Sequence, residues 1–398
     1  MNTVELFTGA GGLALGLARA GFQHAALVEW DHDACQTLRA NLGRGVAGPE
    51  GWPVFECDAR RLDYSALRAP VDLLAGGVPC QPFSIGGKHK GHRDERNMFP
   101  EVVRAVRELR PKAVLLENVR GLLRRNFARY FSHVQLSLAY PEVVQRHGED
   151  WLDHLARLER HHTRGRRDGL FYRVVFRHVN AADYGVPQRR ERVFIVAIRG
   201  DLSVAWGFPR PTHSADALLW SKSVSGEYWD RHRVASGKRN PGRVARAEKL
   251  DQLRLFPPTT RPWLTVRDAL VGLPSPAPSR GPEEPSLTHF EIPGARRYSG
   301  HTGSALDEPA KTLKAGDHGV PGGENMLAAP DGSVRYFTIR ESARLQTFPD
   351  GFIFPGSWTE SMRQIGNAVP VSLAQVIGEH LREALSRADR RPDAREPV

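Results

Sequence analysis

VELFTGAGG, residues 4–12, predicts a short strand that runs through a glycine turn into a helix over residues 13–18. Strand, glycine turn and helix in this order open a nucleotide-binding α/β unit, because glycines let a ligand lie against the backbone. The turn has the spacing Gly-x-Gly-Gly, and Glu5 beside it would repel phosphates. The stretch therefore predicts an α/β protein with a doubly wound, mostly parallel sheet and a nucleoside site that does not hold a pyrophosphate.

Two acidic residues follow the next two predicted strands. Glu29 comes after residues 25–28, about 20 residues past the glycines, which is the spacing of a ribose-hydroxyl acceptor. Asp58 follows residues 54–57, where a carboxylate could receive the exocyclic amine of an adenine. The alternative is that both acids cap helices. The pattern favours S-adenosylmethionine, an adenosine with a cationic sulfur, over NAD.

A thiol and a third strand-end acid form the next pair. Cys80 lies between two prolines in GGVPCQPFS, residues 76–84, directly after an apolar run over residues 71–75. Open α/β sheets keep their reactive groups at this end of a strand, although a lone cysteine is often a small buried hydrophobe. Glu117 ends the next strand, and a right-handed crossover would place it beside Cys80 unless it caps a helix.

The sequence QRRER, residues 188–192, precedes an apolar strand over residues 193–198. In extended backbone Arg190 and Arg192 would point to the same face. Two guanidinium groups on one face suit a phosphate or a base carbonyl, and a surface salt-bridge strand is the alternative.

Composition limits the compartment and the partners. A net charge of +11 on 398 residues indicates a polyanionic partner, since Lys and Arg gain affinity by releasing counterions from phosphates. No apolar stretch approaches the roughly 20 residues that cross a bilayer, so we expect a cytoplasmic protein without a membrane partner. The three cysteines lack metal-ligand spacing, and His161 and His162 lack partners at such a spacing, so no metal is predicted.

The chain changes character twice. Residues 124–167 are basic and rich in histidine, and we interpret them as an insertion of unknown role. From about residue 200, proline, glycine, tryptophan and arginine dominate, and residues 311–325 resemble a set of loops. This composition predicts a second domain that recognises its partner through loops, with Trp206, Trp220 and Trp263 in a small core. A disordered linker is the alternative. Helices are expected over residues 337–346 and 371–385.

Six segments together resemble the motifs of the DNA (cytosine-5) methyltransferase family, in the family's order. They are residues 7–12, 79–81, 117–119, 188–192, 340–346 and 366–369. One departure is Glu5, where the family usually has Asp. The resemblance implies a cofactor-binding catalytic domain over residues 1–199 and 360–398, and a target-recognition domain over residues 200–359.

The resemblance also implies roles for single residues. Cys80 would add to C6 of a flipped-out cytosine, Glu117 would hold and protonate N3, and Arg190 and Arg192 would bind the base carbonyl and a phosphate. The implied contacts to S-adenosylmethionine are Phe7, Gly9, Gly11, Gly12, Glu29, Trp30, Asp58, Asn367 and Val369. The implied substrate contacts are Gln81, Ser84, Gln188 and Thr312. Implied partners are double-stranded DNA, bound by a monomer, and a restriction endonuclease with the same target.

Three other functions remain as alternatives. A tRNA cytosine methylase shares the motifs but usually has a much smaller recognition region. A DNA-binding regulator without catalysis would not need intact Cys80, Glu117 and arginines. An NAD-linked oxidoreductase would bind nicotinamide and would use no thiol nucleophile.

Overall fold

A computed structural model describes residues 1–45, 51–67, 70–79, 97–165, 167, 169–239, 247–278, 289–299, 301–315 and 325–389. The chain divides into two compact units. The first contains residues 1–179, 191–209 and 374–398, and the second contains residues 180–190 and 210–373. The boundaries between the units fall at 209/210 and 373/374, and residues 180–190 belong to the second unit.

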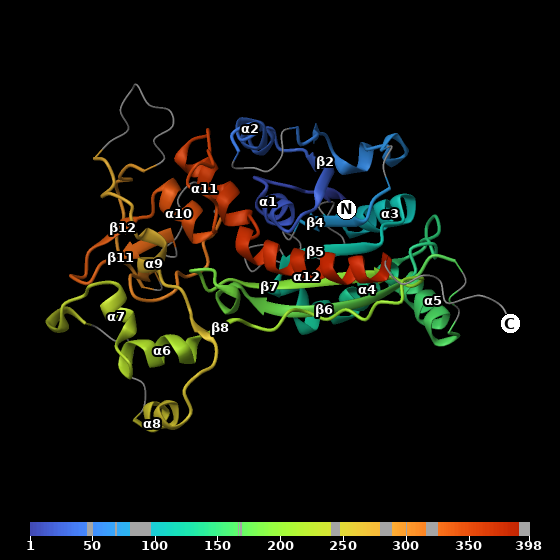
Figure 1. Ribbon diagram of the computed structural model, residues 1–398. Helices are drawn as coiled ribbons and strands as arrows, with labels where there is room; N and C mark the ends of the chain where they lie inside the picture. The colour runs from blue at the N-terminus through green and yellow to red at the C-terminus, as the bar shows by residue number, and fades with distance from the viewer. Residues whose placement is uncertain are drawn as a thin grey trace. The chain divides into compact units, whose positions relative to one another are not determined.

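The first unit is built on a seven-stranded sheet in the order β3-β2-β1-β4-β5-β7-β6 (Figure 1). Its strands are β1 (Asn2–Leu6), β2 (Gln23–Glu29), β3 (Val54–Glu56), β4 (Leu73–Gly77), β5 (Ala113–Val119), β6 (Tyr172–Asn180) and β7 (Glu191–Arg199). Strands β3, β2, β1, β4 and β5 pair in parallel, and β7 joins β5 in antiparallel register. The predicted α/β class with a mostly parallel sheet is confirmed.

Helices connect and cover these strands. They are α1 (Gly12–Arg19), α2 (His32–Ala40), α3 (Phe99–Leu109), α4 (Ala128–Ala139), α5 (Trp151–Thr163) and α12 (Val371–Asp389), with the short 3-10 turns η1 (Ala59–Arg61), η2 (Tyr64–Ala66), η4 (Arg120–Leu123) and η5 (Arg125–Phe127). Apolar side chains of β1, β2, β4, β5 and β7 form one buried core with those of α3 and α4.

The last helix returns to the first unit, as the family resemblance implies. From Ala374 onward α12 belongs to this unit and lies beside α1 (Figure 1). The contact is close, because a Cβ atom on Gly378 would lie 2.9 Å from the side chains of Leu17 and Ala20. In the described part of the chain, no helix combines the length and apolar character that crossing a bilayer requires.

The second unit contains short elements. They are η6 (Ala181–Tyr184), β8 (His213–Ser214), α6 (Ala215–Ser223), α7 (Glu227–Arg231), η7 (Ser236–Lys238), α8 (Ala247–Leu255), β9 (Arg261–Pro262), α9 (Val266–Leu270), β10 (Ser304–Ala305), β11 (Met326–Ala328), β12 (Val334–Tyr336), α10 (Ile339–Leu345) and α11 (Trp358–Asn367). Buried Leu218, Tyr228 and Trp229 pack with Trp263. The described part of the second unit is therefore folded and is not a disordered linker. Trp206, which was expected in the same small core, instead packs against Phe208 in the first unit.

Candidate active site

The glycine turn after β1 has a backbone that few residues adopt. Phe7, Gly9 and Gly11 all have left-handed φ angles, of 57°, 56° and 84°. This region is costly for a residue with a large side chain such as Phe7, so the turn is held by its surroundings. The Thr8 amide donates to the carbonyl of Val28 at 3.2 Å, which ties the turn to β2.

Glu29 at the end of β2 organises this turn. Its Oε2 accepts the amide of Gly9 at 2.7 Å, and its Oε1 accepts the amides of Trp30 and Asp31 at 2.9 Å. Burial raises the pKa of the Glu29 carboxyl, while the three backbone donors act in the opposite direction. Glu29 is not a helix cap, because Asp31 caps α2. The Trp30 side chain beside it is 73% exposed, so an indole face is open next to the turn.

Asp58, by contrast, makes the contacts that a capping acid makes. It is the N-cap of η1 and accepts the amide of Arg60 at 2.9 Å. The Arg60 guanidinium also pairs with it, at 2.5 Å between Nη2 and Oδ2, and holds the pKa of the carboxyl below its usual range. Any ligand amine that Asp58 binds would have to share the carboxylate with Arg60.

The strand that leads to Cys80 ends beside Glu117. Gly77 of β4 is in register with Glu117 of β5. The Val78 amide donates to the Glu117 carbonyl, and the Asn118 side chain donates to the Val78 carbonyl, each at 3.2 Å. Cys80 itself, like the predicted contacts Gln81 and Ser84, lies outside the described residues. Val78, two residues before Cys80, is nevertheless held against the end of β5, where Glu117 lies.

Glu117 forms a nearly buried ion pair with Arg192. The Arg192 Nε lies 2.8 Å from Glu117 Oε1, and the two side chains are 13% and 9% exposed. The pair follows from the sheet, because Arg192 on β7 is in register with Val119 on β5. A carboxyl held by a guanidinium at a strand end can bind a heterocycle and exchange a proton with it.

Arg190 lies outside the strand that carries Arg192, so alternation along a strand does not relate their two side chains. β7 begins at Glu191, and Arg190 precedes it in the second unit. The Arg190 guanidinium is buried, at 1% exposure, and donates to the carbonyls of Leu313 at 3.3 Å and Gly366 at 2.8 Å. These contacts hold two distant segments together, and a role of Arg190 in substrate binding stays a prediction.

Gln188 takes part in the same set of contacts. It is fully buried and donates to the carbonyl of Leu345 and to Gln346 Oε1, while its own oxygen accepts the amide of Leu313. Gln346, in turn, donates to the carbonyls of Ile365 and Ala368 at 2.7 and 3.1 Å. Gln188 and Gln346 thus connect three segments of the second unit, and a contact of Gln188 with substrate stays a prediction.

The remaining predicted residues of the second unit lie near these contacts. The Thr312 hydroxyl donates to the Arg189 carbonyl at 2.7 Å. Asn367 is exposed at the end of α11, and Val369 is buried two residues later.

Comparison with known proteins gives a consistent result. The family model of C-5 cytosine-specific DNA methylases matches residues 1–140 and 166–383. The chain is 36% identical over 395 residues to the type II methyltransferase M.PspPI of Psychrobacter sp. (strain TA137), over 97% of this chain and 80% of that one. It is 34% identical to the type II methyltransferase M.Eco47II of Escherichia coli, over 98% and 81% of the two chains.

One solved structure extends the likeness to the fold. A prophage-encoded protein of E. coli, assigned as a DNA modification methyltransferase, matches with a TM-score of 0.60. The match covers 97% of this chain and 99% of that one at 22% sequence identity.

Proposed function

Because this chain belongs to the C-5 cytosine-specific DNA methylase family, we propose that it transfers a methyl group from S-adenosylmethionine to C5 of a cytosine in double-stranded DNA. The observation that supports this most directly is the buried pair of Glu117 and Arg192, next to the strand end that leads to Cys80. Together these side chains are a carboxyl, a guanidinium and a thiol, which are the groups that activation of a pyrimidine requires.

The glycine turn fits the cofactor. S-adenosylmethionine, when bound, supplies the methyl group from its sulfonium centre. Trp30 offers an exposed ring for the adenine, and Glu29 combines its backbone contacts with lone pairs for the ribose hydroxyls. The left-handed turn from Phe7 to Gly11 would let the backbone approach the amino acid part of the cofactor. Asp58, Gly12, Asn367 and Val369 complete the proposed contacts.

The reaction needs an activated ring, because C5 of cytosine is a poor nucleophile. The target base leaves the duplex, and the Cys80 thiolate adds to C6. Glu117 holds N3 and gives it a proton as negative charge builds on the ring, and Arg192 holds both the carboxyl and the base carbonyl. After C5 has accepted the methyl group, loss of its proton restores the double bond and expels Cys80. Gln81, Ser84 and Thr312 are proposed substrate contacts.

The relatives suggest the biological setting. M.PspPI and M.Eco47II are named as type II methyltransferases. We therefore expect this protein to act as a monomer on one short DNA sequence, and to protect it from an endonuclease with the same target.

The test measures the product and the covalent step together. Purified protein is incubated with cofactor and unmethylated duplex, and bisulfite sequencing should find 5-methylcytosine at one short motif. A duplex with 5-fluorocytosine should remain covalently bound on a denaturing gel, because fluorine at C5 cannot leave as a proton does.

Two variants and a control locate the chemistry. Cys80→Ser should abolish methylation and the covalent complex, and Glu117→Gln should slow methylation by roughly 100-fold or more while DNA still binds. Cys57→Ser, which removes a different thiol, should behave like the wild type. Full activity in Cys80→Ser, or a methyl group on another atom, would refute the proposal.

A further inference from the structure

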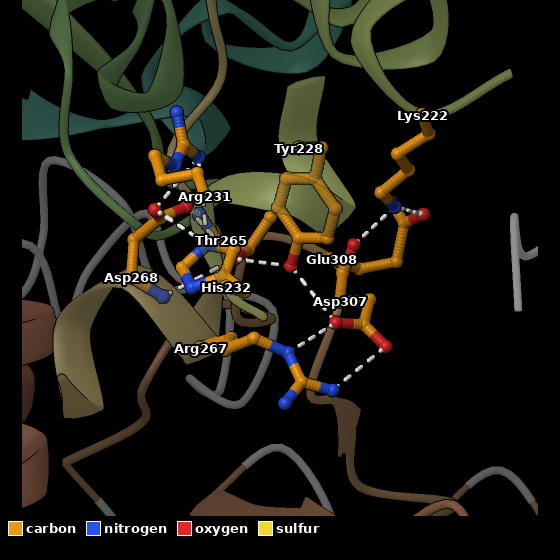
Figure 2. Close-up of polar contacts among 9 residues, drawn as sticks. All are labelled: Lys222, Tyr228, Arg231, His232, Thr265, Arg267, Asp268, Asp307 and Glu308. Atoms are coloured by element: carbon orange, nitrogen blue, oxygen red, sulfur yellow. Dashed lines mark hydrogen bonds and ion pairs between the residues drawn. The ribbon is translucent and has the colours of Figure 1, made fainter. Parts of the chain in front are cut away.

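A lysine is buried in the second unit, in the cluster of Figure 2. The Lys222 side chain on α6 is 2% exposed. Its Nζ lies 2.9 Å from Glu308 Oε1, donates to the carbonyl of Asp307, and sits 5.3 Å from the centre of the Tyr228 ring. A charge that is removed from water to this degree is stable only when it is paired, so Lys222 fixes the position of Glu308.

The residue before Glu308 is held just as firmly. The Asp307 carboxylate accepts the Tyr228 hydroxyl at 2.8 Å and the Arg267 Nε at 2.6 Å, as Figure 2 shows. The main chain is fixed on both sides, because Arg267 and Val266 donate their amides to the carbonyls of Leu306 and Glu308. Three helices, α6, α7 and α9, therefore determine where residues 306–308 lie.

Glu308 divides its two oxygens between a buried and an exposed cation. Oε1 meets Lys222, and Oε2 lies 2.7 Å from the Nη2 atom of Arg189. The Arg189 side chain is 52% exposed, and its guanidinium carbon lies 5.4 Å from the centre of the Trp263 ring. Its backbone is paired as well, with the amide donating to Ala310 and the carbonyl accepting the Thr312 hydroxyl. An exposed guanidinium is thus held by its backbone, a carboxylate and an indole.

We propose that Arg189 binds a phosphate of the DNA backbone and that Glu308, itself held by Lys222, positions the guanidinium for this contact. The inference rests on the proposed function, because it takes duplex DNA as the ligand. A guanidinium has five N–H donors in a planar fork, and the contact with Glu308 uses one of its nitrogens. Lys222 offsets the charge of Glu308, so the three groups together carry one positive charge toward the phosphate. A side chain that is already ordered loses less entropy on binding.

The salt dependence of DNA binding tests the phosphate contact. Dissociation constants for a labelled target duplex and a scrambled duplex are measured by fluorescence anisotropy over a range of KCl concentrations. Arg189→Gln should lower the slope of log Kd against log salt by about 1, and should weaken binding to both duplexes by a similar factor. Arg110→Gln is the matched control, since Arg110 is an exposed arginine in the first unit, ion-paired to Glu142 at 2.7 Å. The control should keep the wild-type slope.

A charge-neutral double variant tests the positioning. Lys222→Met combined with Glu308→Gln leaves the net charge unchanged but removes the carboxylate that holds Arg189. We expect this double variant to lose affinity and part of the slope, while kcat at saturating DNA stays near the wild-type value. If Glu308 had a structural role alone, the melting temperature would fall and the slope would remain that of the wild type.

The results separate this inference from the proposed function. A wild-type slope in Arg189→Gln overturns the phosphate contact, and a wild-type slope in the folded double variant overturns the positioning role. If the double variant does not fold, Arg189→Gln still tests the phosphate contact. The single variant Glu308→Gln then tests the positioning role. Removal of one negative charge should by itself tighten DNA binding, so weaker binding by Glu308→Gln would show that the carboxylate positions Arg189. Failure of the wild type to bind duplex DNA in a salt-dependent way would instead refute the proposed function.

Discussion

Glu5 is a carboxyl group buried in β1, at 1% exposure, beside the glycine turn. Burial raises its pKa well above 4.5, the Glu29 carboxyl adds to this rise, and the amide of Ala14 opposes it. Between about pH 4.5 and the folded-state pKa, the folded protein binds a proton at Glu5 that the unfolded chain has lost. The contribution of Glu5 to stability is therefore greatest at low pH and falls as the pH rises through this window.

Replacement of Glu5 by Gln should remove this dependence. The free energy of unfolding of Glu5→Gln, minus that of the wild type, should increase with rising pH, by up to about 1.4 kcal/mol per pH unit within the window. Urea denaturation at a series of pH values from 4.5 upward measures this difference. Glu159→Gln, at an exposed glutamate on α5, controls for the loss of one carboxyl. A difference that does not change with pH would mean that Glu5 is ionised in the folded protein.

Trp30 provides a test of the cofactor site by itself. Its side chain is 73% exposed beside the Glu29 carboxylate, and stacking on an adenine is worth about 0.5–1.5 kcal/mol beyond buried area. Trp30→Ala should therefore weaken binding of S-adenosylmethionine by roughly 10-fold, as measured by titration calorimetry. Phe256→Ala is the control, because Phe256 is an equally exposed aromatic residue in the second unit. Equal affinity of Trp30→Ala and the wild type would exclude stacking on Trp30.

Individual site residues were predictable where the sheet alone determines their position. Glu29 and Glu117 each follow an apolar run, and the carboxyl ends of parallel strands meet at one edge. Arg190 was not predictable, because its partners Leu313 and Gly366 lie 123 and 176 residues further along the chain. Local alternation carries no information about such contacts, and it applies only within a strand.

At the scale of elements, α11 packs against the segment of Lys314 and Ala315 through a glycine. A Cβ atom on Gly366 would lie 2.5 Å from the amide nitrogen of Ala315 and 2.6 Å from the carbonyl carbon of Lys314. Both are main-chain atoms, so the segment would have to move as a whole. Arg190 also donates to the Gly366 carbonyl, which ties the same turn to residues before β7.

Gly366→Ala should consequently lower the free energy of unfolding by about 1–3 kcal/mol and weaken DNA binding. Gly237→Ala is the matched control in the same unit, because a Cβ atom there meets nothing within 4 Å. The control should change stability by less than about 0.5 kcal/mol. Denaturant unfolding of the two variants measures both values. If they proved equal, the close approach of α11 to Lys314 and Ala315 would be wrong.

Longer elements were predictable and the shortest were not. The strand expected over residues 71–75 is β4 (Leu73–Gly77), and the helix expected over residues 371–385 is contained in α12. Strands β10, β11 and β12 have two or three residues each, which is too short to show an alternation. Their pairing comes from contacts within the second unit, which a periodic pattern does not encode.

For the whole molecule, composition shows where the character of the sequence changes, but it does not show which segments pack together. Residues 180–190 join the second unit although they lie between two strands of the first. The reason is again distant pairing, since Gln188 bridges to Ala310 and accepts the amide of Leu313. A change in composition shows only where the residue content of the chain changes. A compact unit includes every segment that packs into it, wherever that segment lies in the sequence.

The net charge of +11 predicts that the affinity of the whole molecule for DNA depends on the salt concentration. Each phosphate that a lysine or arginine neutralises releases condensed counterions, and this release is less favourable when the salt concentration is high. If the wild type contacts about six phosphates, its affinity for duplex DNA should fall by about 1,000-fold between 50 and 200 mM salt, for target and scrambled sequences alike. The ratio of the two affinities, which base contacts determine, should change far less. Filter binding over this range measures both quantities, and an affinity independent of salt would show that the positive charge serves another partner.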